Sequence, residues 1–319
     1  MQSMTVDRRD FLGLGLAAPP VLLGARAARP ALALVTADTE SHVAVVALAR
    51  GRVVQRLRTV QNPRSVQSGP HGLAVVAHGD AGAVSLLDGR PLRVRRVLRG
   101  FSSSRYTEIR RSGRIAYVSD SGHGEVAVID LLAGRVVRRV AVGDGARHLT
   151  LDRSGRRLWV ALGSSAAQIV VLDVADASRP RVIDRISPPF LAHDVGFSPS
   201  GRRVWVTAGR ERRIAVYAAG ARRPVRILRA DAAPQHVTFG PGAAYVTSGD
   251  SASLRTHRLS DGAVRRSARV PGGSYNVQRS GDRVVTPSLG SGALTVLDLR
   301  GVVRAELHVA AAAHDACIV

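Results

Sequence analysis

Two polar positions recur seven times along the sequence, each time directly before a short apolar segment. The first position holds Arg64, Arg105, Arg147, His193, Gln235, either Ser274 or Tyr275, and His314. The second position holds Ser65, Tyr106, His148, Asp194, His236, Asn276 if the register shifts by one, and Asp315. The residues that follow are mostly Val, Leu, Thr or Gly, as expected of buried strands. The residues that we expect to bind a ligand are Arg64, Arg105, Arg147, His193, Gln235, His236, His314 and Asp315.

Three consecutive repeats place arginine at the first position, as Arg64, Arg105 and Arg147. A guanidinium group presents paired N–H donors that match a carboxylate or a phosphate. The sequence therefore predicts a site for an anionic ligand. The alternative is a polar, water-filled channel that needs no ligand.

Histidine and aspartate in the same set suggest proton transfer. His193 or His148 with Asp194 would form a histidine–carboxylate pair, and Glu108 lies further along a neighbouring strand. The sequence has no Gly-x-Ser-x-Gly motif and no Gly-rich phosphate loop. Catalysis by His193, Asp194 and His148 is thus a hypothesis without a supporting motif.

A metal site would need about three ligands within bonding distance. The ligand types are present in His193, Asp194, His314 and Asp315, but these come from repeats that are not neighbours. No His-x-x-x-His pair occurs, and the single cysteine, Cys317, excludes a cysteine cluster and an intrachain disulfide. We expect no metal and no cofactor.

The elements that must position these residues are short strands. Each repeat contains four strands over about forty residues, which is the period of a propeller blade. The last segment, from His314, has only a first strand, and the opening segment, from Leu32, has only the other three. Joining them closes the ring without free edges. The sequence predicts an all-β, seven-bladed β-propeller with four antiparallel strands per blade, whose N- and C-terminal strands share one blade.

A recurring motif of an aromatic residue, valine and a small residue carries a family resemblance. It occurs as Tyr117-Val118-Ser119, Trp159-Val160-Ala161, Trp205-Val206-Thr207 and Tyr245-Val246-Thr247. With the Ser-Pro-Ser-Gly turn at 198–201, it resembles the YVTN family of β-propeller repeats over residues 32–319, although Val284-Val285-Thr286-Pro287 departs from it. That family and the similar lactonase-like propellers include surface proteins, binding scaffolds and a few enzymes. The resemblance implies a fold but no particular reaction.

The resemblance also implies where the polar positions lie. In such propellers the strand after each inter-blade loop is nearest the axis, so its first residues ring the mouth of the central channel. His42, His78 and His123 fall in or beside loops that would emerge on the same face. We therefore expect a His- and Arg-rich face at the channel mouth.

The first residues have the form of an export signal. Asp7-Arg8-Arg9-Asp10-Phe11-Leu12 precedes a short apolar run and the small-x-small sequence Ala25-Arg26-Ala27, and it resembles a twin-arginine signal. The alternative, a membrane anchor, would need a longer apolar run. We expect residues 1–27 to be removed and residues 28–319 to form the propeller, in the periplasm, at the cell wall or secreted, with no transmembrane segment.

Charge sets the class of partner. The formal net charge is +22, and all 46 basic residues are arginine. Removing residues 1–27 takes away three arginines and two aspartates, which leaves +21. Many arginines lie where a blade would end, as at 93–99, 135–139 and 222–229, which predicts a solvated rim. Weak adhesion to acidic polymers is expected, but only 4% of residues are aromatic, which disfavours specific nucleic-acid binding.

Three functions fit these patterns. The first is an exported binding module for a small anionic ligand or a protein partner. The alternative is a lactonase-like hydrolase or isomerase that acts on a carboxylate-bearing substrate at the same site. The third, a redox propeller with a cofactor, has only the export signal in its support.

Overall fold

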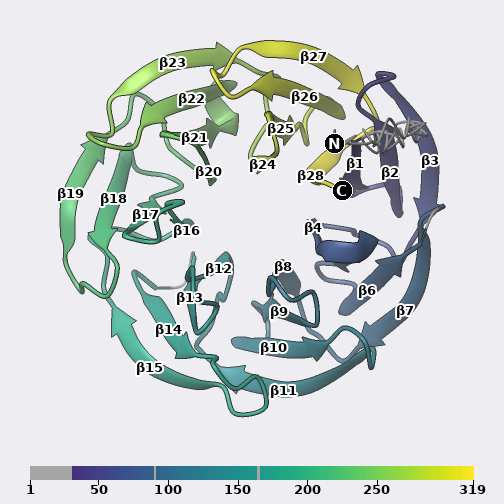
Figure 1. Cartoon of the computed structure of the whole chain (residues 1–319), viewed down its shortest axis with the longest axis horizontal. Helices are drawn as coiled ribbons and strands as arrows, with labels where there is room; N and C mark the ends of the chain where they lie inside the picture. Colours follow the sequence, from purple (N-terminus) through teal and green to yellow (C-terminus); the bar gives the residue numbers. More distant parts are fainter. Residues whose placement is uncertain (1–30, 90, 164–165) are drawn as a thin grey trace, which may run out of the picture.

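Each repeat forms a sheet of four antiparallel strands, and seven such sheets stand around a central axis (Figure 1). The computed structural model describes residues 31–89, 91–163 and 166–319. The predicted seven-bladed β-propeller is confirmed, and the innermost strands of neighbouring blades contact one another around the ring.

The blades are numbered here in chain order, with their strands given from axis to rim. Blade 1 comprises β4(Ser65–Ser68), β5(Ala74–Ala77), β6(Ala83–Asp88) and β7(Arg93–Arg99). Blade 2 comprises β8(Ser104–Ile109), β9(Ile115–Asp120), β10(Glu125–Asp130) and β11(Arg135–Ala141). Blade 3 comprises β12(Leu149–Leu151), β13(Arg157–Ala161), β14(Ile169–Asp173) and β15(Arg181–Ile186). Blade 4 comprises β16(Asp194–Phe197), β17(Arg203–Thr207), β18(Arg213–Ala218) and β19(Pro224–Arg229).

Three further blades follow, and the last of them joins the two ends of the chain. Blade 5 comprises β20(Val237–Gly240), β21(Ala243–Ser248), β22(Ser253–Arg258) and β23(Val264–Arg269). Blade 6 comprises β24(Gln278–Ser280), β25(Arg283–Pro287), β26(Ala293–Asp298) and β27(Val303–His308). Blade 7 comprises β28(Ala313–Ile318), β1(Leu32–Ala37), β2(His42–Ala47) and β3(Arg52–Arg58), so the last strand completes the sheet of the first three. Two 3₁₀ turns, η1(Pro70–Gly72) and η2(Gly249–Ser251), interrupt the strands.

The aromatic motif packs one blade on the next. The indole of Trp159 on β13 meets the ring of Phe197 on β16 edge to face, with centroids 5.6 Å apart. Trp205 on β17 and Phe239 on β20 repeat the contact one blade later, at 6.0 Å. Both indoles are almost completely buried. The motif therefore specifies blade contacts, and burial of such rings is a large stabilising contribution.

The hydroxyl at the end of the motif links two blades. Thr207 Oγ1 accepts a hydrogen bond from the N–H of Asp194, 3.1 Å away, and donates one to the carbonyl of Gln235 in the next blade. Thr36 makes the same two bonds, with the N–H of Asp315 and the carbonyl of Arg64. These bonds hold the beginnings of adjacent inner strands at fixed positions around the axis.

The outermost strands carry the arginine-rich rim. The strands β7, β11 and β19 are the last in their sheets, and most of their arginines are exposed. The expected solvated rim is confirmed for these strands. In the described part of the chain, no helix is long and apolar enough to cross a membrane.

Candidate functional site

All seven inner strands begin at the same end of the propeller, which we call the upper face. The upper ring comprises the residues at the first repeated position, Arg64, Arg105, Arg147, His193, Gln235, Tyr275 and His314. The lower ring comprises the residues that follow them, Ser65, Tyr106, His148, Asp194, His236, Asn276 and Asp315. Thr247 Oγ1 donates to the carbonyl of Tyr275 as Thr207 does to that of Gln235. This equivalence settles the register in blade 6, where Tyr275 and not Ser274 belongs to the upper ring.

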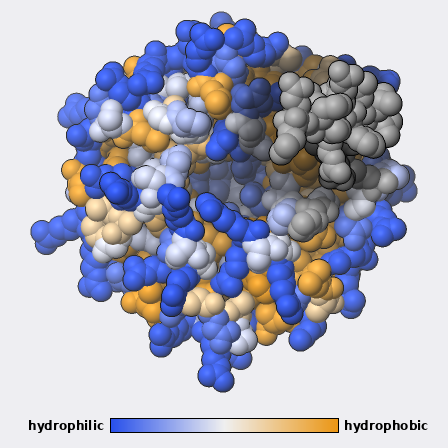
Figure 2. All heavy atoms as spheres, in the orientation of Figure 1, coloured by the Kyte–Doolittle hydropathy of each residue, from blue (hydrophilic) through white to orange (hydrophobic). Residues whose placement is uncertain are grey.

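The upper ring brings three arginines from adjacent blades together. Arg64, Arg105 and Arg147 form no ion pair with any residue that the structure describes, and their Nε atoms are buried without a hydrogen-bond partner in that part of the chain. Burial lowers the pKa of Arg105, the positive charges of Arg64 and Arg147 lower it further, and Asp80 and Tyr106 raise it. The centre of the propeller is hollowed and bordered largely by hydrophilic residues (Figure 2). The upper ring is therefore a concentration of positive charge without a direct ion pair among the described residues, although Asp38 and Asp80 act on its arginines from a greater distance.

Glycines in the loops between second and third strands make room for the upper ring. A Cβ atom at Gly163, whose φ is +57°, would lie 2.0 Å from Cδ of Arg147. At Gly209, with φ of +72°, it would lie 2.7 Å from Cβ of His193. Both backbone conformations favour glycine, so these loops are shaped around the side chains of the ring.

An upper cavity of about 240 Å³ opens beside Arg147 and His193. Gln235 and Tyr275 also line it, but Asp250 accepts hydrogen bonds from both, at 3.0 and 2.8 Å. Gln235 Oε1 in turn accepts from the N–H of Gly249 at 2.6 Å. The amide of Gln235 is thus already hydrogen-bonded at both ends, whereas Arg147 retains free donors toward this cavity.

His314, on the other side of the upper ring, also has a partner. Its Nδ1 lies 3.0 Å from Oδ2 of Asp38. Burial lowers the pKa of His314, although this carboxylate raises it. The structure therefore gives His314 a local partner that the sequence analysis did not include.

The lower ring does not line the open mouth as we expected, but closes the channel beneath it. Its residues are between 1% and 7% exposed. The rings of Tyr106 and His148 have centroids 3.4 Å apart, those of His148 and His236 4.0 Å, and those of Tyr106 and His236 5.7 Å. Because Tyr106 and His236 belong to blades 2 and 5, their contact crosses the axis. The side chains of the lower ring close the channel because several of them are large enough to meet at the axis.

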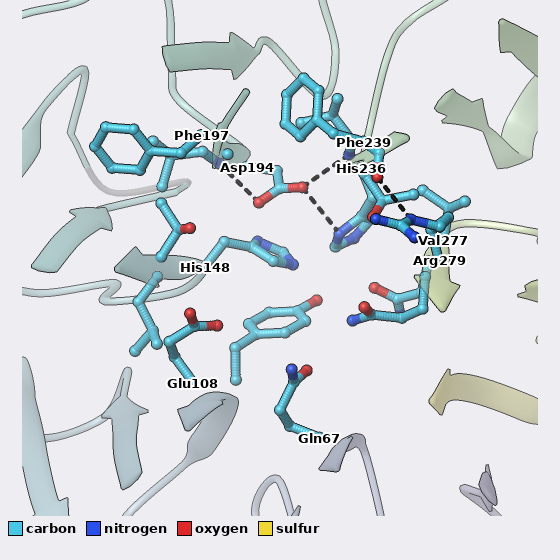
Figure 3. Close-up of a pocket in the computed structure, with 18 of the residues that line it drawn as sticks. Gln67, Glu108, His148, Asp194, Phe197, His236, Phe239, Val277 and Arg279 are labelled. Atoms are coloured by element: carbon cyan, nitrogen blue, oxygen red, sulfur yellow. Dashed lines mark hydrogen bonds and ion pairs between the residues drawn. The ribbon is translucent and has the colours of Figure 1, made fainter. Parts of the chain in front are cut away.

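Beneath the lower ring lies a second cavity of about 390 Å³, which opens toward the lower face and is shown in Figure 3. Glu108, Asp194 and Asp315 line it. Burial raises the pKa of each of these carboxyl groups to about 7, against hydrogen bonds from backbone N–H groups that lower it. Acidic groups that change protonation near neutrality therefore gather in this lower cavity.

The two aspartates of the lower ring join neighbouring blades. Asp194 accepts from the N–H of Val195 at 2.7 Å and from that of Val237, in the next blade, at 2.9 Å (Figure 3). Asp315 likewise accepts from Ala316 at 2.8 Å and from Val66 at 3.0 Å. These contacts give both aspartates a role in the fold that sequence patterns did not reveal.

The histidine–carboxylate pair is formed by a different histidine from those we expected. Asp194 Oδ2 lies 3.6 Å from Nδ1 of His236, and the two side chains point toward each other (Figure 3). His148 instead directs Nδ1 to the carbonyl of His193, 2.7 Å away. The expected pairing of His193 or His148 with Asp194 is wrong, because the carboxylate leans toward blade 5.

The loop histidines lie on the expected face but differ in their surroundings. His78 is completely buried, with its two ring nitrogens 3.1 Å from the carbonyl of Gln61 and 2.7 Å from the hydroxyl of Ser85. His123 is half exposed and lies 3.0 Å from Asp120. His42 Nδ1 lies 3.3 Å from the carbonyl of Glu40. None of the three points into the upper cavity.

No protein-family model matches the sequence, and no curated protein matches it. Solved structures share the fold. A protein of unknown function from Desulfotomaculum acetoxidans has a TM-score of 0.79 and 11% identity, over 90% of this chain and 98% of that one. A candidate 6-phosphogluconolactonase from Bacteroides uniformis has a TM-score of 0.76 and 13% identity, over 91% and 100%. Hydrazine synthase from Kuenenia stuttgartiensis has a TM-score of 0.71 and 17% identity, over 84% and 92%. At such identities the likeness shows the propeller fold alone.

Proposed function

We propose that this chain is a binding protein whose upper ring holds a small anionic ligand through Arg64, Arg105 and Arg147. The observation that carries the proposal is the grouping of these three guanidinium groups, none of which forms an ion pair or an Nε hydrogen bond with a described residue. Like charges brought together and partly buried cost free energy, and a carboxylate or phosphate between them would offset that cost. Each guanidinium can donate two parallel hydrogen bonds to such a group.

Calorimetric titration of metal-free protein with citrate and with inorganic phosphate tests the proposal. We expect binding of at least one of them, weakened about tenfold or more by Arg105→Gln or Arg147→Gln, since each removes a charge-assisted contact. Arg138→Gln is the matched control, because Arg138 is an exposed rim residue on β11 and its loss changes the net charge equally. Equal weakening in all three variants would show that only overall charge attracts the anion, and no binding by the unaltered protein would refute the proposal.

A lactonase-like hydrolase is the second candidate function, and the lower cavity is the observation in its favour. His236 and Asp194 form a histidine–carboxylate pair there, and Glu108 has a pKa of about 7. Groups that titrate near neutrality can act as general acids or bases. Two candidate 6-phosphogluconolactonases among the structures of similar fold are consistent with this alternative.

Hydrolysis of glucono-δ-lactone separates the two functions. An enzyme should exceed the spontaneous rate, and His236→Gln should abolish the excess. If the unaltered protein gives only the spontaneous rate while it binds citrate or phosphate, the binding function stands and the hydrolase is excluded for this substrate.

We also propose export of the folded protein by the twin-arginine route. The proposed signal, residues 1–27, lies outside the described residues, and its support is the paired Arg8 and Arg9 before a short apolar run. Replacing both arginines by lysine should leave the precursor in the cytoplasm, whereas continued export would exclude this route. The charge of +21 that remains on residues 28–319 should retain the exported protein weakly on acidic polymers, in a salt-sensitive manner.

A further inference from the structure

Three histidines from consecutive blades meet where the channel closes. His148 and His236 belong to the lower ring and His193 to the upper ring, and one ring nitrogen of each lies within 4.8 Å of those of the other two. The ring centroid of His193 lies 5.4 Å from that of His148 and 5.1 Å from that of His236. His193 faces the upper cavity, whereas the other two line the lower cavity. The cluster therefore lies between the two cavities.

Hydrogen bonding leaves one of these rings with a free lone pair. The carbonyl of His193 can only accept, so Nδ1 of His148 carries the proton, at 2.7 Å. Nε2 of His148 is then the unprotonated nitrogen, and it is buried without a partner among the described residues. An imidazole that donates from one nitrogen to a carbonyl and offers the other to the site is the arrangement found at metal-bound histidines.

A second ring has the other usual supporting group. Nδ1 of His236 lies 3.6 Å from the carboxylate of Asp194, which is itself held by two backbone N–H groups (Figure 3). A carboxylate behind a histidine orients the ring and makes its other nitrogen a better ligand. Two of the three histidines thus have outer contacts suited to metal binding, although no contact among them requires an ion.

We propose that His148, His193 and His236 bind one divalent transition-metal ion, with zinc as the best match. Three imidazoles favour zinc, copper, nickel or cobalt over magnesium or calcium, which prefer oxygen ligands. Tetrahedral zinc with Zn–N bonds of about 2.0–2.1 Å needs nitrogens about 3.4 Å apart, so the rings must approach by on the order of 1 Å. Small side-chain rotations achieve such a shift. The fourth position is left for water or another ligand.

Burial is the largest cause that lowers the pKa values of all three rings. Positive charge opposes a bound cation: Arg147 lowers the pKa of each ring, Arg64 lowers those of His193 and His236, and Arg210 lowers that of His193. The same lowering keeps the rings neutral near pH 7, as ligands must be. Asp194, whose Oδ2 lies 3.6 Å from Nδ1 of His236, supplies a compensating negative charge when it is ionised.

Titration of the metal-free protein with Co²⁺ tests the site directly, because tetrahedral cobalt absorbs visible light and reports its own coordination. We expect one ion per chain with the tetrahedral spectrum, displacement of Co²⁺ by Zn²⁺, and at least about a fiftyfold weaker affinity in His148→Phe and His193→Asn. His193→Asn is included because His193 is only partly buried, so this variant keeps the buried packing even if His148→Phe fails to fold.

The matched control is His123→Asn. His123 is half exposed, and with buried Asp120 and partly buried Glu125 it forms a separate group that also offers three ligand atoms within 4.8 Å of one another. Binding that survives His193→Asn but is lost in His123→Asn would move the ion to that group and overturn the proposal, as would the absence of a tetrahedral spectrum. Anion binding by the arginines is measured on metal-free protein, so either proposal can fail without the other.

Discussion

The upper and lower rings are adjacent in the sequence, yet the fold treats their side chains in opposite ways. In the lower ring, Asp315 and Asp194 are buried, and each accepts hydrogen bonds from two blades. In the upper ring, Arg64, Arg105 and Arg147 have neither an acidic partner nor a partner for Nε in the described part of the chain. Buried polar groups with partners stabilise a fold, whereas charged groups without them indicate a ligand. The comparison therefore separates residues that hold blades together from residues that bind.

The largest expected effect tests the structural half of this comparison. Asp315→Ala removes the acceptor for the N–H groups of Val66 and Ala316 at the junction where the ring closes. Leaving both donors buried should lower the free energy of unfolding by about 3 kcal/mol. Urea denaturation measures it, with Arg64→Ala as the upper-ring control from the same junction, expected to change stability by less than about 0.5 kcal/mol. Similar losses in both variants would remove the distinction between the rings.

A smaller effect concerns pH. Burial raises the pKa of Asp315 to about 7, the N–H groups of Val66 and Ala316 lower it, and Asp194 raises it. A carboxyl group whose pKa is higher in the folded than in the unfolded state binds more protons when folded, so its contribution to stability is present at low pH and is lost as pH rises from about 4 to about 7.

The measurement compares the free energy of unfolding of the unaltered protein with that of Asp315→Asn at pH 5 and pH 8. The difference isolates Asp315 from the buried histidines, whose lowered pKa values act in the opposite direction. Relative to the variant, the unaltered protein should lose on the order of 2 kcal/mol between the two pH values. A constant difference would mean that Asp315 stays ionised throughout.

The smallest expected change in stability tests whether the arginines of the upper ring have a binding role. Arg105→Met removes one of three mutually repelling charges and keeps an unbranched, flexible side chain, so the ligand-free protein should become more stable by up to about 1 kcal/mol. Arg138→Met on the exposed rim should leave stability unchanged. Denaturation at low ionic strength, without multivalent anions, measures both. A loss of stability in Arg105→Met would show that this arginine has a structural role.

The propeller could be predicted from the sequence to the level of individual strands. The opening segment from Leu32 was expected to supply three strands of the shared blade, and it forms β1(Leu32–Ala37), β2(His42–Ala47) and β3(Arg52–Arg58). Blade 6 was ambiguous because Val284-Val285-Thr286-Pro287 lacks the aromatic residue of the motif, and the hydrogen bond from Thr247 resolved its register. Local patterns sufficed because each blade is built from contacts within one repeat and with its neighbour.

The site could be predicted only as a set of positions. The residues of both rings could be identified by their place in the repeat. The sequence did not reveal that Asp194 pairs with His236, that His314 contacts Asp38 or that three histidines meet. The expectation that no metal binds rested on spacing along the chain. Residues one blade apart form no local spacing motif, so that criterion could not detect this cluster.

The sequence by itself determined how many blades form, how the ends close the ring and which residues face the axis. It does so because strand periodicity, turn residues and motif aromatics act over a few residues or between adjacent repeats. Only the tertiary structure decided which axial side chains have hydrogen-bond or ion-pair partners and which do not. The side chains at the axis come from different blades, so their partners depend on how seven sheets tilt and converge. An arginine or histidine at the axis therefore has a structural or a binding role, depending on which side chains of the other blades lie opposite it.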